Sequence, residues 1–188
     1  MMSGSAPSSR SDCIPRFGPL FYLRSMLEAY KHIIDQAKAK SGETNKFLER
    51  LRQRKPRDLD QVTNALHDEA FGHIDCLQCA NCCSSTGPLL LDKDIERLAK
   101  HFKIKPSVFT EKHLVLDEEG DYIFKGMPCP FLGADKYCCA YESRPNACRE
   151  FPHTQQRNIA QKLKITALNA VICPAVAEVV EGLKKHYV

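Results

Sequence analysis

Hydrophobic residues in the first part of the chain recur at intervals of three and four positions, which is the spacing of an amphipathic helix. The first such pattern predicts a helix over residues 19 to 40, and Ser41-Gly42 follows it as a stop signal. A second pattern covers residues 47 to 51, and a third covers residues 59 to 71 after a break at Pro56. We therefore expect three helices in this part of the chain.

The middle of the chain predicts two more helices and a hairpin. Asp92 can cap the first of them, because its carboxylate can accept an N–H of the first turn. The apolar positions of this helix follow the i, i+3, i+4, i+7 rule and are Ile95, Leu98, Ala99 and Phe102. Pro106 fits the first position of a short helix ending near Leu114, since its missing N–H costs nothing there. Apolar runs at residues 114 to 116 and 122 to 124, joined by an acidic turn, predict a small β-hairpin.

Two helices are expected at the C-terminal end of the chain. Residues 159 to 171 predict one, and Pro174 opens the other. The second helix carries its apolar residues on one face, at Val176, Val179, Val180 and Leu183. The fold class predicted from the whole pattern is mainly α with a small β-hairpin, an α+β arrangement.

Residues 1 to 18 are rich in Ser, Pro, Arg and Gly and poor in apolar residues, so we expect a disordered tail that contains Cys13. This stretch lacks the apolar run of roughly 7 to 15 residues that a secretory signal requires. No segment approaches the roughly 20 apolar residues of a membrane span. We therefore expect a cytoplasmic protein without a membrane partner, divided into a tail (1–18), an N-terminal helical segment (19–75) and a cysteine-rich domain (76–188).

The composition adds one unusual feature, which is cysteine. The chain has 188 residues, of which 43% are hydrophobic and 27% charged, so a collagen-like or wholly disordered protein is excluded. Ten residues are cysteine: four fall in residues 76–83, four in residues 129–148, and Cys13 and Cys173 stand alone. Because the cytoplasm keeps thiols reduced, metal binding or redox chemistry is their expected use.

The formal net charge of +4 is weak evidence for an anionic partner. Cysteine counts as neutral in that sum, but eight thiolates holding two divalent ions would add about −4 and bring the loaded protein to about zero. The basic stretch at residues 46 to 57 could contact phosphates. Its interleaved acidic and apolar residues fit a solvated amphipathic face better, so we do not expect nucleic acid as a partner.

The most informative segment is Cys76-Leu77-Gln78-Cys79-Ala80-Asn81-Cys82-Cys83. A spacing of two residues lets a tight turn aim successive sulfurs at one ion about 2.3 Å away, as in zinc and iron–sulfur sites. The run also resembles the opening of the bacterial ferredoxin pattern, whose distant cysteine precedes proline, as Cys129-Pro130 and Cys173-Pro174 do here. Neighbouring side chains point in different directions, so one of Cys82 and Cys83 either serves a second centre or packs as a small apolar residue.

Three further segments accompany this octapeptide: Asp94-Ile95-Glu96-Arg97-Leu98-Ala99, Cys129-Pro130-Phe131-Leu132, and residues 138 to 152, which read CCAYESRPNACREFP. Together these motifs resemble the CxxCxxCC family of zinc- or iron-chelating domains, over about residues 76 to 183. The resemblance implies that the metal ligands are Cys76, Cys79, Cys82, Cys83, Cys129, Cys138, Cys148 and Cys173. Cys139 and the N-terminal 75 residues lie outside the family's pattern, so we do not count Cys139 among the ligands.

The second cysteine cluster also carries cationic and aromatic side chains. Four thiolates on one Zn²⁺ leave a net charge of about −2, so guanidinium groups close to the sulfurs would offset this charge and orient the ligands. We therefore expect Tyr141, Arg144 and Arg149 to surround the metal or cofactor. The alternative is that both arginines are solvated or form salt bridges with Glu142 and Glu150.

The sequence allows two interpretations of the role of each of three other residues. Cys173 stands at a helix start, where the helix dipole favours a thiolate, or it makes a buried apolar contact. His73 and His153 could each replace a thiolate ligand, or they are ordinary helix-end or surface histidines.

Three classes of function follow from these patterns. In the first, which we favour, the clustered cysteines chelate zinc or iron in a module whose fold depends on the metal. In the second, they hold an iron–sulfur cluster for a redox or methyl-transfer-type enzyme or accessory protein. Similar cysteine arrangements occur in flagellin lysine methylases, but we do not transfer methylation to this chain. The third class is a zinc-stabilised nucleic-acid-binding module. The sequence identifies no catalytic residue, substrate or protein partner, and we expect the two cysteine clusters to meet in space.

Overall fold

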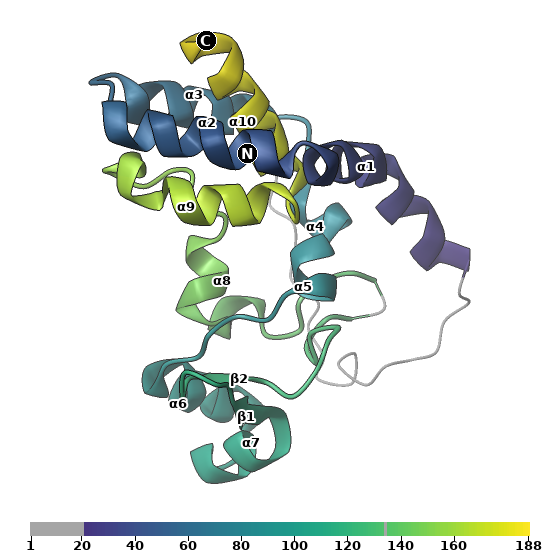
Figure 1. Ribbon diagram of the computed structural model, residues 1–188. Helices are drawn as coiled ribbons and strands as arrows, with labels where there is room; N and C mark the ends of the chain where they lie inside the picture. Colours follow the sequence, from purple (N-terminus) through teal and green to yellow (C-terminus); the bar gives the residue numbers. More distant parts are fainter. Residues whose placement is uncertain (1–20, 134) are drawn as a thin grey trace.

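The chain folds into short helices and one hairpin, as seen in a computed structural model that describes residues 21–133 and 135–188 (Figure 1). The tail predicted at residues 1 to 18, with Cys13, lies outside the described residues. The elements are α1 (Phe21–Ala39), α2 (Ser41–Arg54), α3 (Leu59–Phe71), α4 (Cys76–Cys79), α5 (Asn81–Ser85), α6 (Asp92–Phe102), α7 (Pro106–His113), β1 (Leu114–Leu116), β2 (Tyr122–Phe124), η2 (Tyr141–Ser143), α8 (Asn146–Glu150), α9 (Ile159–Ala170) and α10 (Pro174–Tyr187). The predicted class, mainly α with a small β-hairpin, is confirmed. In the part of the chain that is described, no helix combines the length and apolarity needed to cross a membrane.

Most elements lie where the sequence pattern predicts them. Strands β1 and β2 pair antiparallel, with Leu114 opposite Phe124. Pro106 occupies the first turn of α7, where a missing N–H leaves no bond unmade. Helices α9 and α10 begin at Ile159 and Pro174, as expected.

Two details differ from the prediction. Ser41-Gly42 does not lead into a loop but begins α2, two residues after the last residue of α1, Ala39. A first helical turn tolerates these residue types, because its N–H groups have no intrahelical partner to lose. Asp92 is the first residue of α6 rather than its cap, and the carboxylate of Asp94 accepts the N–H of Leu91 at 3.1 Å instead.

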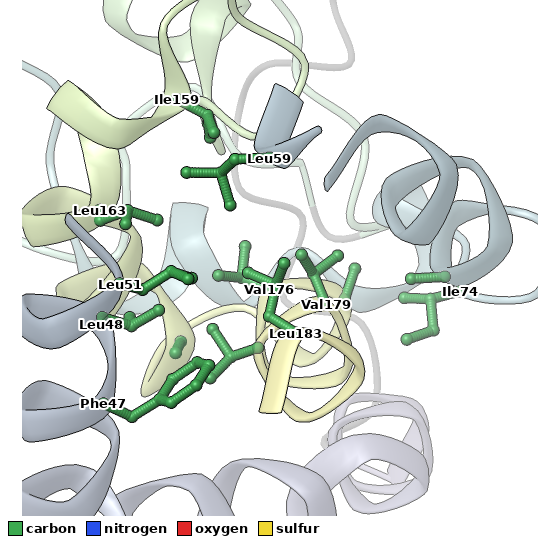
Figure 2. Packing of buried hydrophobic residues seen from close by; sticks show 14 residues of the cluster. Phe47, Leu48, Leu51, Leu59, Ile74, Ile159, Leu163, Val176, Val179 and Leu183 are labelled. Atoms are coloured by element: carbon green, nitrogen blue, oxygen red, sulfur yellow. The ribbon is translucent and has the colours of Figure 1, made fainter. Parts of the chain in front are cut away.

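The larger hydrophobic core, which we call the bundle core, lies between α2, α3, α9 and α10 (Figures 1 and 2). Leu48 and Leu51 of α2 pack with Leu163 of α9 and Leu183 of α10, and each of these side chains is 2% exposed or less. Full burial of a leucine contributes roughly 1.5–3 kcal/mol. This core contains residues from both sides of the boundary that we predict at residue 75, and that domain division stays a prediction.

The smaller hydrophobic core, which we call the hairpin core, lies between α6, α7 and the hairpin. Phe131, from the loop after β2, stands at its centre. The Phe131 ring stacks on Phe102 at a centroid distance of 4.8 Å and meets the edge of Phe124 at 5.3 Å. Phe109 and Leu98 complete the core with side chains that are 0% exposed.

The cysteine segments occupy the region between the two cores, which we call the junction. It comprises α4, α5, residues 129–148 and Cys173 (Figure 1). Cys173 packs against the bundle core, whereas Cys129 and Cys138 pack against the hairpin core. The fold therefore places the thiols where two separately packed parts of the protein meet.

Candidate metal centre

The first cysteine cluster is divided between two short helices. Cys76 and Cys79 lie on α4, and Cys82 and Cys83 lie on α5. Ala80 separates the helices with φ at +46°, a left-handed conformation that costs an L-residue roughly 1–2 kcal/mol. The Ala80 side chain is buried, and its N–H closes α4 on the carbonyl of Cys76 at 3.0 Å. The chain thus changes direction between the two cysteine pairs.

Two hydrogen bonds join α5 to cysteine segments that are distant in sequence. The N–H of Cys129 donates to the carbonyl of Cys83 at 2.8 Å. The Asn81 side-chain amide donates to the carbonyl of Ile172 at 2.6 Å, directly before Cys173. The first cluster therefore lies beside both the second cluster and the isolated C-terminal cysteine, as we expect from the sequence.

The second cluster is held by backbone contacts with the hairpin core. The N–H of Cys139 donates to the carbonyl of Phe131 at 2.8 Å, and Cys138 forms an isolated antiparallel bridge with Leu132. Cys148 follows on the short helix α8. Phe131 lies at the centre of the hairpin core, so these bonds fix the cluster relative to that core.

Cys82 and Cys83 are adjacent in sequence, and their sulfurs lie 3.9 Å apart rather than on opposite sides of the chain. Either thiol can donate in this contact, which raises the pKa of the Cys82 thiol and lowers the pKa of the Cys83 thiol. Two sulfurs bound to one zinc at about 2.3 Å in a tetrahedral site are separated by about 3.8 Å. The observed separation therefore suits two ligands of one ion or of two adjacent ions.

None of the nine cysteines of the described residues forms a disulfide, and most of them are partly buried. Burial raises the pKa of Cys129, Cys148 and Cys173 to about 12. Burial also raises the pKa of Cys76 and Cys79. In the metal-free protein these five groups are consequently neutral at pH 7, and a bound metal has to displace their protons.

The thiols lie within electrostatic reach of one another. Besides burial, the negative charge of Cys83 raises the pKa of Cys76, Cys79, Cys129 and Cys148. Such interactions fade beyond about 10 Å at ordinary ionic strength. Cys83 is therefore a common neighbour of both clusters.

Cys173 lies close to thiols of the first cluster. Besides burial, the charges of Cys76 and Cys79 raise its pKa. Within the second cluster, the charges of Cys129 and Cys138 likewise raise the pKa of Cys148.

The donor set fits zinc or iron, because thiolates are preferred ligands of both metals. Within residues 21–133 and 135–188, however, no three His, Cys, Asp or Glu side chains lie close enough together to hold one ion. Coordination therefore requires the thiols to lose their protons and to draw closer to one another.

Arg144 and Arg149, the two arginines expected around the metal, have different positions. The Arg144 guanidinium lies 3.8 Å from the centroid of the Tyr141 ring, and its charge opposes the burial-driven rise in the pKa of Cys76 and of Cys148. Arg149 donates to the backbone carbonyls of Glu142 and Arg144 rather than to a carboxylate. Arg144 is thus within electrostatic reach of thiols, whereas Arg149 stabilises the loop that precedes α8.

The two histidines that could replace a thiolate have other contacts. His73 bonds to the Glu178 carboxylate at 2.8 Å and to the carbonyl of Glu69 at 3.0 Å. His153 lies 3.2 Å from the side-chain nitrogen of Gln156. These contacts fit the alternative reading of ordinary structural histidines.

Sequence reasoning overlooked the role of Asp94 and Arg97. Asp94 is a buried carboxylate and accepts the backbone N–H of Asn146 at 3.1 Å, two residues before Cys148. Leu91, which precedes α6, is not a capping residue type, so the sequence does not mark Asp94 as a capping partner. Its long-range bond could not be inferred, since nothing in the local pattern couples residue 94 to residue 146.

A search of family models identifies a match to the model described as "CxxCxxCC: Putative zinc- or iron-chelating domain" over residues 75–174, which is more than half of the chain. No curated protein and no solved structure matches the chain. The matched region runs from the residue before α4 to the first residue of α10 and includes every cysteine of the junction.

Proposed function

Because the chain belongs to the CxxCxxCC family of zinc- or iron-chelating domains, we propose that it binds zinc or iron through cysteine thiolates at the junction. The proposed ligands are Cys76, Cys79, Cys82, Cys83, Cys129, Cys138, Cys148 and Cys173. The observation that carries the proposal is the hydrogen bond from the backbone N–H of Cys129 to the carbonyl of Cys83. It joins the two clusters in the region between the hydrophobic cores. A reducing compartment such as the cytoplasm would keep these thiols available.

The metal's role in this proposal is to hold the two parts of the protein together. The bundle core and the hairpin core are separate hydrophobic clusters. Helices α5 and α8, which carry Cys82, Cys83 and Cys148, contain no buried residue. Because a structural metal site rarely exists in an unfolded chain, its binding free energy adds to the free energy of folding.

Eight thiolates are twice the four that one zinc ion or one four-iron cluster takes, so the proposal divides them into two sets. The bundle-side set is Cys76, Cys79, Cys82 and Cys173, and the hairpin-side set is Cys83, Cys129, Cys138 and Cys148. The Asn81 contact with Ile172 supports the first set, and the bond from Cys129 to Cys83 supports the second. The 3.9 Å separation of the Cys82 and Cys83 sulfurs makes the two centres neighbours.

Arg144 has the role of charge compensation in this arrangement. Its guanidinium acts on one thiol from each set, Cys76 and Cys148. Stacking on Tyr141 and the bond from its Nη1 to the Tyr141 carbonyl at 2.7 Å fix its position. Arg149 supports the same loop through its bond to the Arg144 carbonyl.

The test is elemental and acid-labile sulfide analysis of the protein purified without oxygen, together with its absorption spectrum. One or two zinc ions per chain and no colour would assign a zinc module. Iron with matching sulfide and a band near about 400 nm would assign an iron–sulfur protein. Cys148→Ser is expected to lose only the metal of the hairpin-side set, whereas the matched control Cys139→Ser retains the full content. A folded wild-type protein without zinc or iron overturns the proposal.

A further inference from the structure

Asp94 is a buried carboxylate outside the cysteine segments, with a side chain that is 1% exposed. It lies in the first turn of α6 and accepts the backbone N–H groups of Leu91 and Asn146, each at 3.1 Å. The guanidinium of Arg97, one turn further along α6, also donates to it. A buried charge is costly unless it is paired and hydrogen-bonded, and Asp94 has three donors.

The guanidinium of Arg97 also forms hydrogen bonds with the backbone that precedes α8. Its Nη2 donates to the carbonyl of Arg144 at 2.9 Å, and its Nε donates to the carbonyl of Ser143 at 3.3 Å. Asp94 and Arg97 together therefore bind three backbone groups within residues 143–146. We call this arrangement the Asp94–Arg97 clamp.

The clamped segment leads directly into the helix that carries Cys148. The carbonyl of Pro145 accepts the N–H of Cys148 at 3.0 Å. Arg149 adds a bond from α8 back to the carbonyl of Arg144 at 3.2 Å. The clamp therefore fixes the position of Cys148 relative to α6 and, through α6, relative to the hairpin core.

We propose that Asp94 and Arg97 are positioning residues of the metal centre, which hold Cys148 in place without contacting the metal. This inference rests on the proposed metal-binding function. Groups that orient metal ligands typically contribute 10–100-fold to metal affinity. Arg97→Gln, which removes the bonds to two carbonyls, is accordingly expected to weaken metal binding by about 10–100-fold.

A second variant removes a single bond of the clamp. Asn146 is the first residue of α8, a position where proline is well tolerated. Pro145 before it has φ −53° and ψ 154°, the conformation that a following proline favours. Asn146→Pro therefore deletes the N–H that Asp94 accepts while leaving the local backbone conformation allowed. We expect weaker metal binding from this change as well.

The probe is Co²⁺, titrated without oxygen into the reduced, metal-free full chain. Its visible bands report both the occupancy and the geometry of thiolate coordination. The control is Arg52→Gln, since Arg52 pairs with Glu49 at the same i,i+3 spacing on α2, with 2.6 Å between Nη2 and Oε1. Arg97→Lys keeps a positive charge next to Asp94 but lacks the planar guanidinium that reaches several acceptors at once. It should therefore bind Co²⁺ more tightly than Arg97→Gln but less tightly than the wild type.

The expected result is weakened Co²⁺ binding and shifted visible bands for Arg97→Gln and Asn146→Pro, with Arg52→Gln matching the wild type. Wild-type affinity and bands in both clamp variants would overturn the inference. A lower unfolding temperature with unchanged bands would also overturn it, because that is the signature of a purely structural role. If the wild-type chain binds neither Co²⁺, zinc nor iron, the proposed function itself fails, and the inference fails with it.

Discussion

The backbone N–H of Cys129 donates a hydrogen bond to the carbonyl oxygen of Cys83 at 2.8 Å. Cys83 lies on α5, which Asn81 ties to the backbone before α10, whereas Cys129 packs against the hairpin core. One bond thus joins two cysteine segments that belong to different parts of the fold. The metal-binding proposal depends on this meeting, because no single segment provides four of the ligands of either set.

Substituting one cysteine from each proposed set tests the division into two centres. Cys173→Ser and Cys138→Ser are each expected to lower the zinc or iron content to about half of the wild-type value, because each set has four thiolates of its own. Metal content per folded chain is the measurement, with Cys139→Ser as the control at full content. Complete loss of metal from either folded variant would show that all eight thiols serve one centre.

Removing the metal is expected to destabilise the whole protein. A ligand that binds only the folded state at about 1,000 times its Kd stabilises that state by about 4 kcal/mol. Urea unfolding of the anaerobic protein, with and without a chelator, measures the difference. An unchanged unfolding midpoint after complete removal of the metal would argue against a structural role.

The bundle core joins the N-terminal helices to Cys173, one of the proposed ligands, which packs against it. Leu51 of α2 is 1% exposed and belongs to the same core as residues of α9 and α10. Leu51→Ala should cost about 2–5 kcal/mol, because it leaves a cavity in that core.

The matched control is Leu168→Ala on α9, since Leu168 is 66% exposed and its truncation should change stability little. Leu51→Ala should also release the metal at a lower temperature, which differential scanning calorimetry combined with a metal-responsive dye would detect. Metal release that stays at the wild-type temperature would mean that the cysteine-rich part folds independently of α2.

Partly buried histidines predict that acid destabilises the protein. Burial lowers the pKa of His67, His113 and His153 below the ordinary value of 6.5. The unfolded chain therefore binds protons at a higher pH than the folded chain, so the stability contributed by these groups is present above pH 6.5 and is lost as the pH falls through the folded pKa.

His67 is the best position for a test, because its Nδ1 lies 2.6 Å from the hydroxyl of Thr154 and links α3 to the segment after α8. His67→Gln should lessen the loss of stability between about pH 7.5 and about pH 5.5. Urea midpoints at the two pH values provide the measurement, and His32→Gln, at an exposed position on α1, is the control. An equal loss in wild type and His67→Gln would exclude this histidine as the cause.

Local signals were sufficient to predict the hairpin and the longer helices, but not the short helices α4, α5, η2 and α8. The hairpin from Leu114 to Phe124 has two short apolar runs around an acidic turn, and its observed strands match the predicted ones residue for residue. Helix α6 carries its apolar positions on one face and ends at Phe102, as its periodicity indicates. Such elements follow from period and turn chemistry alone.

Long-range relationships could not be predicted in this way. Cysteine spacing indicates ligands but does not identify which distant segment lies next to Cys83. The periodicity of α2 and α10 predicts two helices, yet it does not reveal that Leu51 and Leu183 share a core. The hydrogen bond from the N–H of Asn146 to the Asp94 carboxylate depends on tertiary packing between the first turns of α8 and α6. These features are set by the whole fold rather than by any local pattern.

X-ray absorption at the metal edge shows directly whether cysteine sulfur holds the metal. We expect a first coordination shell of sulfur only, at about 2.3 Å for zinc. Nitrogen or oxygen at about 2.0–2.1 Å as the main scatterer would contradict it, since the metal would then be bound elsewhere in the chain.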